Sequence, residues 1–414
     1  MAILRPFCAG RPKKEYAASI AALPYDVMNS REARQVIKTA PLSFLRIDRA
    51  EADLPEGTDP YSQDVYDRAA WNLHALFKDG YMINDPEPRL YLYRQIMNGR
   101  AQTGVVGCVS IDDYMNNVIK KHEHTRADKE VDRIRHVDTC DANTGPIFLT
   151  YRGNEEIDRI LAKYAAREPE YDFVSVGDVR NTVWVIDGKR DIARLQALFK
   201  KIDSLYIADG HHRAASAVAV GRKRREQQPG YTGDEEFNFF LAVLFPGDRL
   251  EIMDYNRVIS DLNDMTVPEL LEKLKKDFTV TEASAPVHPP RKHTFGMYTE
   301  GKWYLLEARD ALIDETDPVA RLDVTILQNS VIGPILEIKD PRKDHRIDFV
   351  GGIRGLSELE KRADGDMKLA FSMYPTTVDD LMAIADAGLI MPPKSTWFEP
   401  KLLSGLFVHW LGKY

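Results

Sequence analysis

Short apolar runs alternate with longer amphipathic stretches along most of the chain. Runs rich in β-branched, leucine and aromatic residues predict strands at residues 42–47, 90–95, 105–111, 173–176, 183–186, 205–208, 237–245, 250–259, 294–297 and 303–306. Apolar residues at three- and four-residue spacing predict helices at residues 30–38, 61–78, 154–166, 189–200, 268–278, 319–336 and 376–387. Two more helices are predicted, one capped by Thr125 and one from His211 onward. This mixture indicates an α+β protein with mixed sheets.

Turn residues between neighbouring strands predict three hairpins. Asn98-Gly99 separates strands 90–95 and 105–111, and Pro246-Gly247-Asp248 separates strands 237–245 and 250–259. Strands 294–297 and 303–306 make the third hairpin. The nearly unbroken apolar run at 237–245 predicts a strand that is buried on both faces.

The length of 414 residues exceeds one typical hydrophobic core and indicates two or three domains. We expect an N-terminal α/β extension at residues 1–115, a core at residues 116–259 and a C-terminal domain at residues 260–414.

Composition and charge narrow the class of protein. A hydrophobic content of 44%, a charged content of 29% and a net charge of −8 are those of a globular protein without the basic patch of a nucleic-acid binder. The three cysteines are too scattered for a disulfide framework or a zinc site. Since no apolar run approaches 18 residues and no signal-peptide pattern is seen, we expect a cytoplasmic protein with no membrane or nucleic-acid partner.

The densest candidate chemistry lies between the predicted strand 205–208 and the helix that follows it. A strand, a tight glycine turn and a helix N-terminus form an anion site, because the first-turn N–H groups lack intrahelical partners. Five consecutive residues carry this site: Asp209, Gly210, His211, His212 and Arg213. The structural alternative is an ordinary connection with a capping aspartate and solvated histidines.

A second polar cluster, Lys-Lys-His-Glu-His-Thr, occupies residues 120–125. His122 and His124 are two residues apart and therefore point in different directions on a strand or a helix, which disfavours a metal site made by this pair alone. Glu123 precedes the predicted helix on its loop side. A solvated polar loop without a function is the alternative.

A third cluster lies in the proline-bracketed loop 391–401, Met-Pro-Pro-Lys-Ser-Thr-Trp-Phe-Glu-Pro-Lys. Lys394 offers a point charge to an anion, and the hydroxyls of Ser395 and Thr396 can hydrogen-bond a phosphate or carboxylate. The alternative is a structured loop with a surface lysine.

Asp-Gly-His-His-Arg at 209–213 resembles the phosphate-binding box of the ParB/sulfiredoxin superfamily, and within it most closely that of the ADP-dependent free serine kinases. His-Glu at 122–123 and Pro-Lys-Ser-Thr at 393–396 match two other motifs of those kinases in the same order. The whole chain resembles a bacterial family catalogued as a domain of unknown function. The likeness to the kinases covers residues from about 116 to the end, whereas the first 115 residues lie outside it. It implies a ParB/sulfiredoxin-like nucleotide-binding core at residues 116–259.

The resemblance implies phosphoryl transfer from a nucleotide, with ADP as the expected donor, to the hydroxyl of free L-serine. Glu123 would be the general base, with His122 beside it, and Asp209 would bind Mg²⁺ or orient the transferred group. Residues 210–213 would hold the donor phosphates, and Lys394, Ser395 and Thr396 the substrate end. These segments should therefore converge on one cleft.

Three other functions fit the same motifs. A non-catalytic nucleotide switch of the ParB type would use the phosphate box without a base, so Glu123 distinguishes it from a kinase. The acceptor can be another small hydroxy compound, with ADP, ATP or CTP as donor. The last alternative is a binding module whose core has lost its activity.

Overall fold

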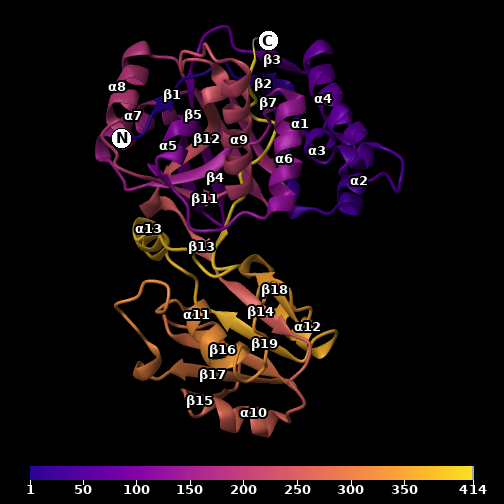
Figure 1. Ribbon diagram of the computed structural model, residues 1–414, viewed down its shortest axis with the longest axis vertical. Coiled ribbons are helices and arrows are strands. Elements are labelled where there is room, and N and C mark those ends of the chain that lie inside the picture. The colour runs from indigo at the N-terminus through magenta and orange to yellow at the C-terminus, as the bar shows by residue number, and fades with distance from the viewer. Residues whose placement is uncertain (413–414) are drawn as a thin grey trace. The chain divides into compact units, whose positions relative to one another are not determined.

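The computed structural model describes residues 1–412 and divides by its internal contacts into two units (Figure 1). The first unit comprises Met1–Leu250 and the segment from Pro400 onward, and the second comprises Glu251–Glu399. The last segment of the chain therefore folds with the first 250 residues. In the described residues no helix is long and apolar enough to cross a bilayer.

A mixed sheet organises the first unit. It contains nine strands within the described residues. Eight of them lie in the order β6 (Ile119–Lys120), β11 (Leu205–Asp209), β8 (Ile147–Tyr151), β12 (Phe239–Pro246), β5 (Arg100–Ser110), β4 (Leu90–Met97), β10 (Val179–Ile186) and β9 (Tyr171–Ser175), and β1 (Leu4–Arg5) pairs with β5. Pairing is parallel for β6 with β11 and for β8 with β12, and antiparallel elsewhere. Two short ribbons join β2 (Gly10–Pro12) to β3 (Met82–Asn84) and β7 (Ala142–Asn143) to β21 (His409–Trp410).

Some helices of this unit pack on the main sheet, and others pack in a separate apolar core. The helices are α1 (Ala17–Ile20), α2 (Ser30–Thr39), α3 (Leu45–Asp48), α4 (Gln63–Lys78), α5 (Ile111–Met115), α6 (Ala127–Cys140), α7 (Glu155–Ala165), α8 (Lys189–Phe199) and α9 (His211–Gln227). Figure 1 shows α6 and α9 side by side, and the two helices are in contact. Small residues in the first half of α9, such as Ala214, Ala217 and Val218, are buried and let the helix pack closely.

The second unit is built on an antiparallel sheet. Its strands lie in the order β15 (Phe278–Ala283), β17 (Lys302–Ala308), β16 (Thr294–Thr299), β19 (Leu369–Met373), β14 (Tyr255–Ile259) and β18 (Ile347–Gly351). Its helices are α10 (Val267–Leu274), α11 (Asp323–Leu327), α12 (Leu356–Asp364) and α13 (Val378–Asp386), and a short ribbon joins β13 (Ile252–Met253) to β20 (Trp397–Phe398). The strands β14 and β19 and the helix α12 share one apolar core, which contains Val258, Leu359 and Ala370.

The mixed α and β content is confirmed, and so are the hairpins β4–β5 and β16–β17. The two-unit division cuts the chain differently from the expected boundaries near residues 115 and 259. Residues 1–115 contribute β1, β4 and β5 to the same sheet that holds β11 and β12. The three-part division and the ParB/sulfiredoxin-like core therefore remain proposals.

Four local predictions were wrong. Residues 42–47 contain no strand: α3 begins at Leu45, and Phe44, Leu45 and Ile47 all pack in the core of α4. Strand 237–245 does not pair with 250–259, because β12 lies between β5 and β8. The helix predicted at 319–336 is shortened to α11 and a π-helical turn at Gln328–Ile332. Arg126, and not Thr125, is the N-cap of α6.

Gly221 in α9 provides a test of the packing of α9 against α5 and against the 3-10 turn at Glu236–Asn238. A Cβ built on Gly221 would clash with the Phe237 carbonyl oxygen and would lie 2.7 Å from Ile111 Cδ1. A glycine to alanine change in an open helix stabilises by about 1 kcal/mol through propensity. Here overpacking against a backbone atom, which costs about 1–3 kcal/mol, outweighs that gain.

We therefore expect Gly221→Ala to lower the free energy of unfolding by up to about 2 kcal/mol, measured by urea denaturation. The control is Arg222→Ala, one residue further on an exposed position of the same helix. A Gly221→Ala variant with an increased melting temperature would contradict this packing.

Candidate functional site

The parallel pairing of β6 and β11 brings two distant loops to one edge of the sheet. Leu205 pairs with Ile119 and Tyr206 with Lys120. Both strands run the same way, so the residues that follow Lys120 and those that follow Tyr206 leave the sheet on the same side. The loop at 121–126 therefore lies beside Asp209 and the N-terminus of α9.

This placement brings Glu123 to the first residue of α9. Glu123 Oε2 lies 3.8 Å from Nδ1 of His211. The ring of His122 is perpendicular to that of His211, with the ring centroids 4.5 Å apart and an interplanar angle of 89°. One nitrogen or oxygen atom from each of these three residues lies within 4.8 Å of the other two. His122, Glu123 and His211 are thus one cluster, although 88 positions separate Glu123 from His211.

The two imidazoles are buried and the carboxylate is half-exposed. His122 is 2% exposed, the side chain of His211 is 5% exposed, and that of Glu123 is 48% exposed. Burial lowers the pKa of His122 to about 4, against an opposing effect of the nearby Asp209 charge. Burial, followed by the proximity of His122, lowers the pKa of His211 well below its ordinary value. Both rings are therefore neutral at pH 7.

Asp209 lies at the end of β11 between two cations. Its Oδ2 accepts a hydrogen bond from Arg213 Nη2 at 3.0 Å, and its Oδ1 lies 3.5 Å from Lys401 Nζ. Burial alone would raise the pKa of Asp209, but Lys401 and Arg213 outweigh it and lower the pKa. Asp209 is therefore an ionised carboxylate at the foot of α9.

Arg213 is folded back toward the sheet. Besides Asp209, it donates from Nη1 to the Pro146 carbonyl oxygen at 2.6 Å, while its buried Nε has no hydrogen-bonding partner. Two nitrogen atoms of Arg213 therefore already donate hydrogen bonds within the protein. Arg213 contributes positive charge to the anion site and fixes the orientation of the Asp209 carboxylate.

Gly210 and His212 shape the start of α9. Gly210 is the N-cap residue at φ 94°, a left-handed conformation that favours glycine, as its place after Asp209 predicts. His212 Nε2 accepts a hydrogen bond at 3.0 Å from the backbone N–H of Arg126, the N-cap of α6. The first turn of α9 therefore helps to begin the neighbouring helix.

Lys394, Ser395 and Thr396 belong to the second unit. Lys394 is exposed, at φ 59°, with its Nζ 5.4 Å from the centroid of the Tyr255 ring. Ser395 is buried and its hydroxyl donates to the Pro392 carbonyl oxygen at 2.6 Å. Thr396 follows at an intermediate exposure. A shared site of these residues with Glu123 remains a proposal.

A small cavity of about 30 Å³ lies next to Arg213 in the first unit. Its lining includes Tyr25, Asp48, Arg133, His136 and Arg213. A space of this size holds water or a carboxylate, and it is far smaller than the roughly 300 Å³ of a pocket for a drug-sized ligand. A nucleotide base therefore does not fit there.

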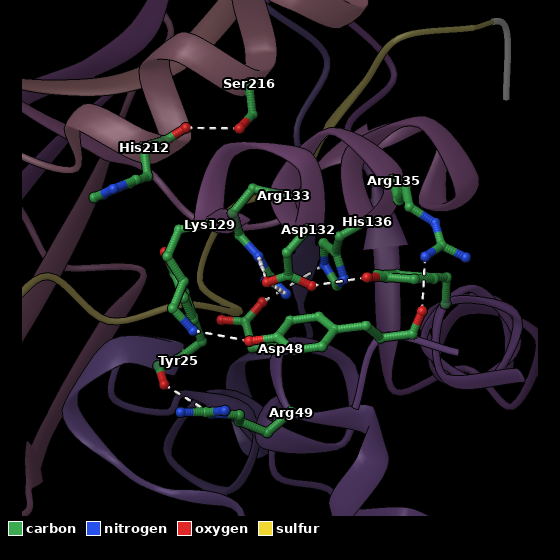
Figure 2. A network of polar contacts seen from close by, with 12 residues as sticks. Tyr25, Asp48, Arg49, Lys129, Asp132, Arg133, Arg135, His136, His212 and Ser216 are labelled. Carbon is green, nitrogen blue, oxygen red and sulfur yellow. Dashed lines mark hydrogen bonds and ion pairs between the residues drawn. The ribbon is translucent and has the colours of Figure 1, made fainter. Parts of the chain in front are cut away.

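The cavity wall is part of a buried polar network, which Figure 2 shows with the side chains of Asp48, Asp132, Arg133 and His136 turned toward one another. Arg133 Nε donates to Asp132 at 2.9 Å, and its guanidinium lies 4.3 Å from the centroid of the Tyr25 ring. The Thr144 hydroxyl donates to Asp48 at 3.1 Å and lies 3.2 Å from His136 Nε2. The network therefore places the buried carboxylates of Asp48 and Asp132 and the guanidinium of Arg133 close to Arg213.

Two groups at this site escaped the sequence reasoning. Lys401 ends the same proline-bracketed loop as Lys394, which was the available signal, but its partner Asp209 lies 192 positions earlier. Arg133 lies in a predicted helix, and its helical position gives no sign of its buried contact with Asp132. The contact between the rings of His122 and His211 also joins residues far apart in the sequence.

The chain belongs to the family described as a protein of unknown function, DUF1015, whose model matches residues 4–325. This confirms the predicted resemblance to a family catalogued by a domain of unknown function. No curated protein matches the chain.

Among solved structures, the chain is similar to a free serine kinase in complex with AMP, at 15% identity and a TM-score of 0.35, over 71% of this chain and 86% of that one. It is also similar to a conserved hypothetical protein from Pyrococcus furiosus, at 15% identity and a TM-score of 0.35, over 73% and 94% of the two chains. SbnI with a C-terminal truncation, from Staphylococcus aureus, gives 12% identity and a TM-score of 0.37 over 72% and 85%. Likenesses at this level do not establish a shared ParB/sulfiredoxin-like core.

The buried network predicts how stability depends on pH. Burial, and then the charge of Arg133, lowers the pKa of His136 well below its ordinary value of 6.5. As pH falls below about 6.5, the unfolded chain binds a proton at this residue and the folded protein does not, so the free energy of unfolding falls. Each such histidine contributes a slope of about 1.4 kcal/mol per pH unit while this difference persists.

We expect His136→Gln to make the fall in stability between pH 6.5 and pH 5 shallower, measured by urea denaturation at each pH in the presence of a chelator. Glutamine retains a hydrogen-bonding group for Thr144. The matched control is His124→Gln at an exposed position, which should leave the slope as in the wild type. An unchanged slope in His136→Gln would show that this histidine titrates normally in the folded state.

Proposed function

We propose that this protein transfers a phosphoryl group from a nucleotide, preferably ADP, to the hydroxyl of free L-serine. One observation carries the proposal: the Glu123 carboxylate lies 3.8 Å from His211 at the N-terminus of α9. A general base and an anion-binding helix end must be neighbours if a hydroxyl is to attack a bound phosphoryl group.

The donor phosphates are proposed to lie at the start of α9. Gly210 has no side chain, so it leaves the first-turn N–H groups of α9 without a capping group and exposes them to an anion. His211, His212 and Arg213 surround this turn. The positive charge of Arg213 and Lys401 raises the electrostatic potential there.

Asp209 fits the expected magnesium ligand in one respect. It is ionised, and Mg²⁺ commonly uses one or two carboxylates together with substrate phosphates. Bound there, Mg²⁺ would offset the negative charge of the phosphates. Arg213 holds Oδ2 of Asp209, and this fixes the direction of the carboxylate.

In the proposed reaction Glu123 accepts the proton of the serine hydroxyl as the oxygen attacks the β-phosphorus of ADP. A new P–O bond to serine forms, the bond to the AMP oxygen breaks, and that oxygen keeps the electron pair, so the products are O-phosphoserine and AMP. Exposure of 48% leaves the Glu123 side chain accessible to a small acceptor. Lys394, Ser395 and Thr396 are proposed to hold the substrate end or the moving phosphoryl group.

A non-catalytic nucleotide switch is the second candidate, because the helix end, Asp209 and Arg213 would bind a nucleotide without any base. The position of Glu123 favours the kinase, since a switch has no use for a carboxylate directed at the phosphate turn.

Replacing the base separates these two candidates. We expect Glu123→Gln to reduce formation of O-phosphoserine by about 10²- to 10⁴-fold, the usual contribution of a general base, with nucleotide affinity nearly unchanged. Phosphoserine is measured by mass spectrometry with ADP, Mg²⁺ and serine, and nucleotide affinity by calorimetry. Glu155→Gln, at the surface start of α7, is the matched control.

Wild-type turnover in Glu123→Gln would contradict the role of this residue as the base. Tight nucleotide binding by the wild-type protein, without transfer to any hydroxy compound, would favour the switch.

The anion site has its own test. We expect Arg213→Ala to weaken nucleotide binding by about 1.5–3 kcal/mol, or roughly 10- to 150-fold, because a charge close to the phosphates is lost. Arg213→Lys, which keeps the charge, should weaken it less, and Arg190→Ala, an exposed residue of α8, should have no effect.

Because the Arg213 side chain is only 11% exposed, unfolding curves of each variant are recorded first. Affinities are then compared at a temperature at which all variants are folded. Equal affinities of the wild type and Arg213→Ala would mean that the phosphates bind elsewhere.

A further inference from the structure

The cluster of His122, Glu123 and His211 also offers metal-ligand chemistry, beyond the roles that the proposed phosphoryl transfer gives to Glu123 and His211. Its two imidazoles come from different segments, the loop after β6 and the first residue of α9, and meet at right angles. The carboxylate of Glu123 lies on the open side of the pair. One donor atom of each residue is within 4.8 Å of the others.

Both histidines contain buried polar atoms without a hydrogen-bonding partner. Nδ1 and Nε2 of His122 and Nε2 of His211 have no hydrogen bond of normal geometry. A buried polar group without a partner costs about 1–3 kcal/mol, and native proteins leave few of them. The Ile207 backbone lies close enough to affect one nitrogen atom of His122. The remaining unpaired nitrogen atoms on the two touching rings indicate a partner that is not part of the chain.

We propose that His122, Glu123 and His211 form a binding site for a divalent transition-metal ion, with Zn²⁺ as the reference ion. Neutral imidazole nitrogen atoms suit Zn²⁺, Co²⁺ and Ni²⁺, whereas Mg²⁺ and Ca²⁺ take oxygen ligands. Two histidines and one glutamate supply three positions of a tetrahedron and leave the fourth open, as in catalytic zinc sites.

The geometry also shows how the site would close on an ion. With Zn–N bonds of about 2.0–2.1 Å, donor atoms around a tetrahedral ion lie about 3.4 Å apart, so the cluster contracts on binding. The buried rings are held by the strand edge and by α9. The half-exposed Glu123 carboxylate, whose Oε2 is 3.8 Å from His211 Nδ1, would have to move closer to the rings.

Metal binding here has a consequence that rests on the proposed function. Glu123 cannot both bind a cation and accept a proton, so an ion in this site stops phosphoryl transfer. This site is separate from Asp209, where Mg²⁺ would support the transfer. We therefore expect Zn²⁺ bound at this site to inhibit the enzyme even when Mg²⁺ is present in excess.

The test measures metal binding without reference to activity. The full-length protein is freed of metal with a chelator and then titrated with Zn²⁺ in competition with a chromophoric chelator. The titration is done in Mg²⁺ at about a hundredfold excess over the protein. We expect one Zn²⁺ per chain, and a loss of affinity of at least about tenfold in His122→Ala and in Glu123→Gln. His124→Ala, an exposed neighbour, is the matched control and should bind as the wild type does.

Cobalt provides a readout that does not depend on the variants folding. Co²⁺ added to the wild-type protein should give the visible absorption of a four-coordinate site with nitrogen and oxygen ligands, and Zn²⁺ should abolish it. Absence of this spectrum together with the absence of Zn²⁺ binding would overturn the proposal. Binding that is equal in His122→Ala, Glu123→Gln and the wild type would overturn it too, since the ion would then sit elsewhere.

The two proposals fail in different ways. Stoichiometric Zn²⁺ binding by a protein that forms no O-phosphoserine leaves the metal site standing and removes the phosphoryl transfer. Phosphoserine formation that is insensitive to Zn²⁺, in a protein that binds none, removes the metal site alone.

Discussion

Everything in the candidate site depends on the parallel contact between β6 and β11. β6 is only two residues long, yet its pairing with Leu205 and Tyr206 sets where the loop at 121–126 leaves the sheet. If that pairing were antiparallel, the loop would leave from the opposite end of the strands, and Glu123 would be remote from the N-terminus of α9. A very short strand thus decides whether a carboxylate and a helix N-terminus share one site.

The interior around this edge contains an unusual amount of paired charge. Asp209 lies between Arg213 and Lys401, and Arg133 is buried beside Asp132. Such pairs are costly to bury and contribute little net stability, so their concentration near α9 favours a function over a purely structural role. His122 and His211, which adjoin these charges, are neutral, and their imidazole lone pairs can bind a cation or accept a hydrogen bond.

Local features of the site were accessible from the sequence, and long-range ones were not. The positive φ of Gly210 and the start of α9 follow from Asp-Gly and the alanine-rich run after it. The proximity of Glu123 to α9 was expected only from the motif resemblance. Hydrophobic periodicity could not predict it, since it depends on β6, a strand of two residues. The contact of Lys401 with Asp209 and the contact between the rings of His122 and His211 join residues that are far apart in the sequence, and no local pattern predicts them.

The same distinction explains the errors in the fold. β12 and β14 are close in sequence and separated by turn residues, yet each pairs with strands far along the chain, β12 with β5 and β14 with β19. Burial by distant partners outweighs a favourable hairpin turn. Likewise the apolar residues at 44–47 are helical because they pack on α4.

The hydrogen bond from the Arg126 backbone to His212 Nε2 links two helices through a single lone pair. That lone pair accepts one hydrogen, so a ligand group that donates to it, or a proton that occupies it, leaves the first amide of α6 without its acceptor. Ligand binding at the N-terminus of α9 and the order of the first turn of α6 are then thermodynamically coupled. Since the loop at 121–126 ends at that amide, whatever takes the histidine nitrogen also loosens the segment that holds Glu123 in place.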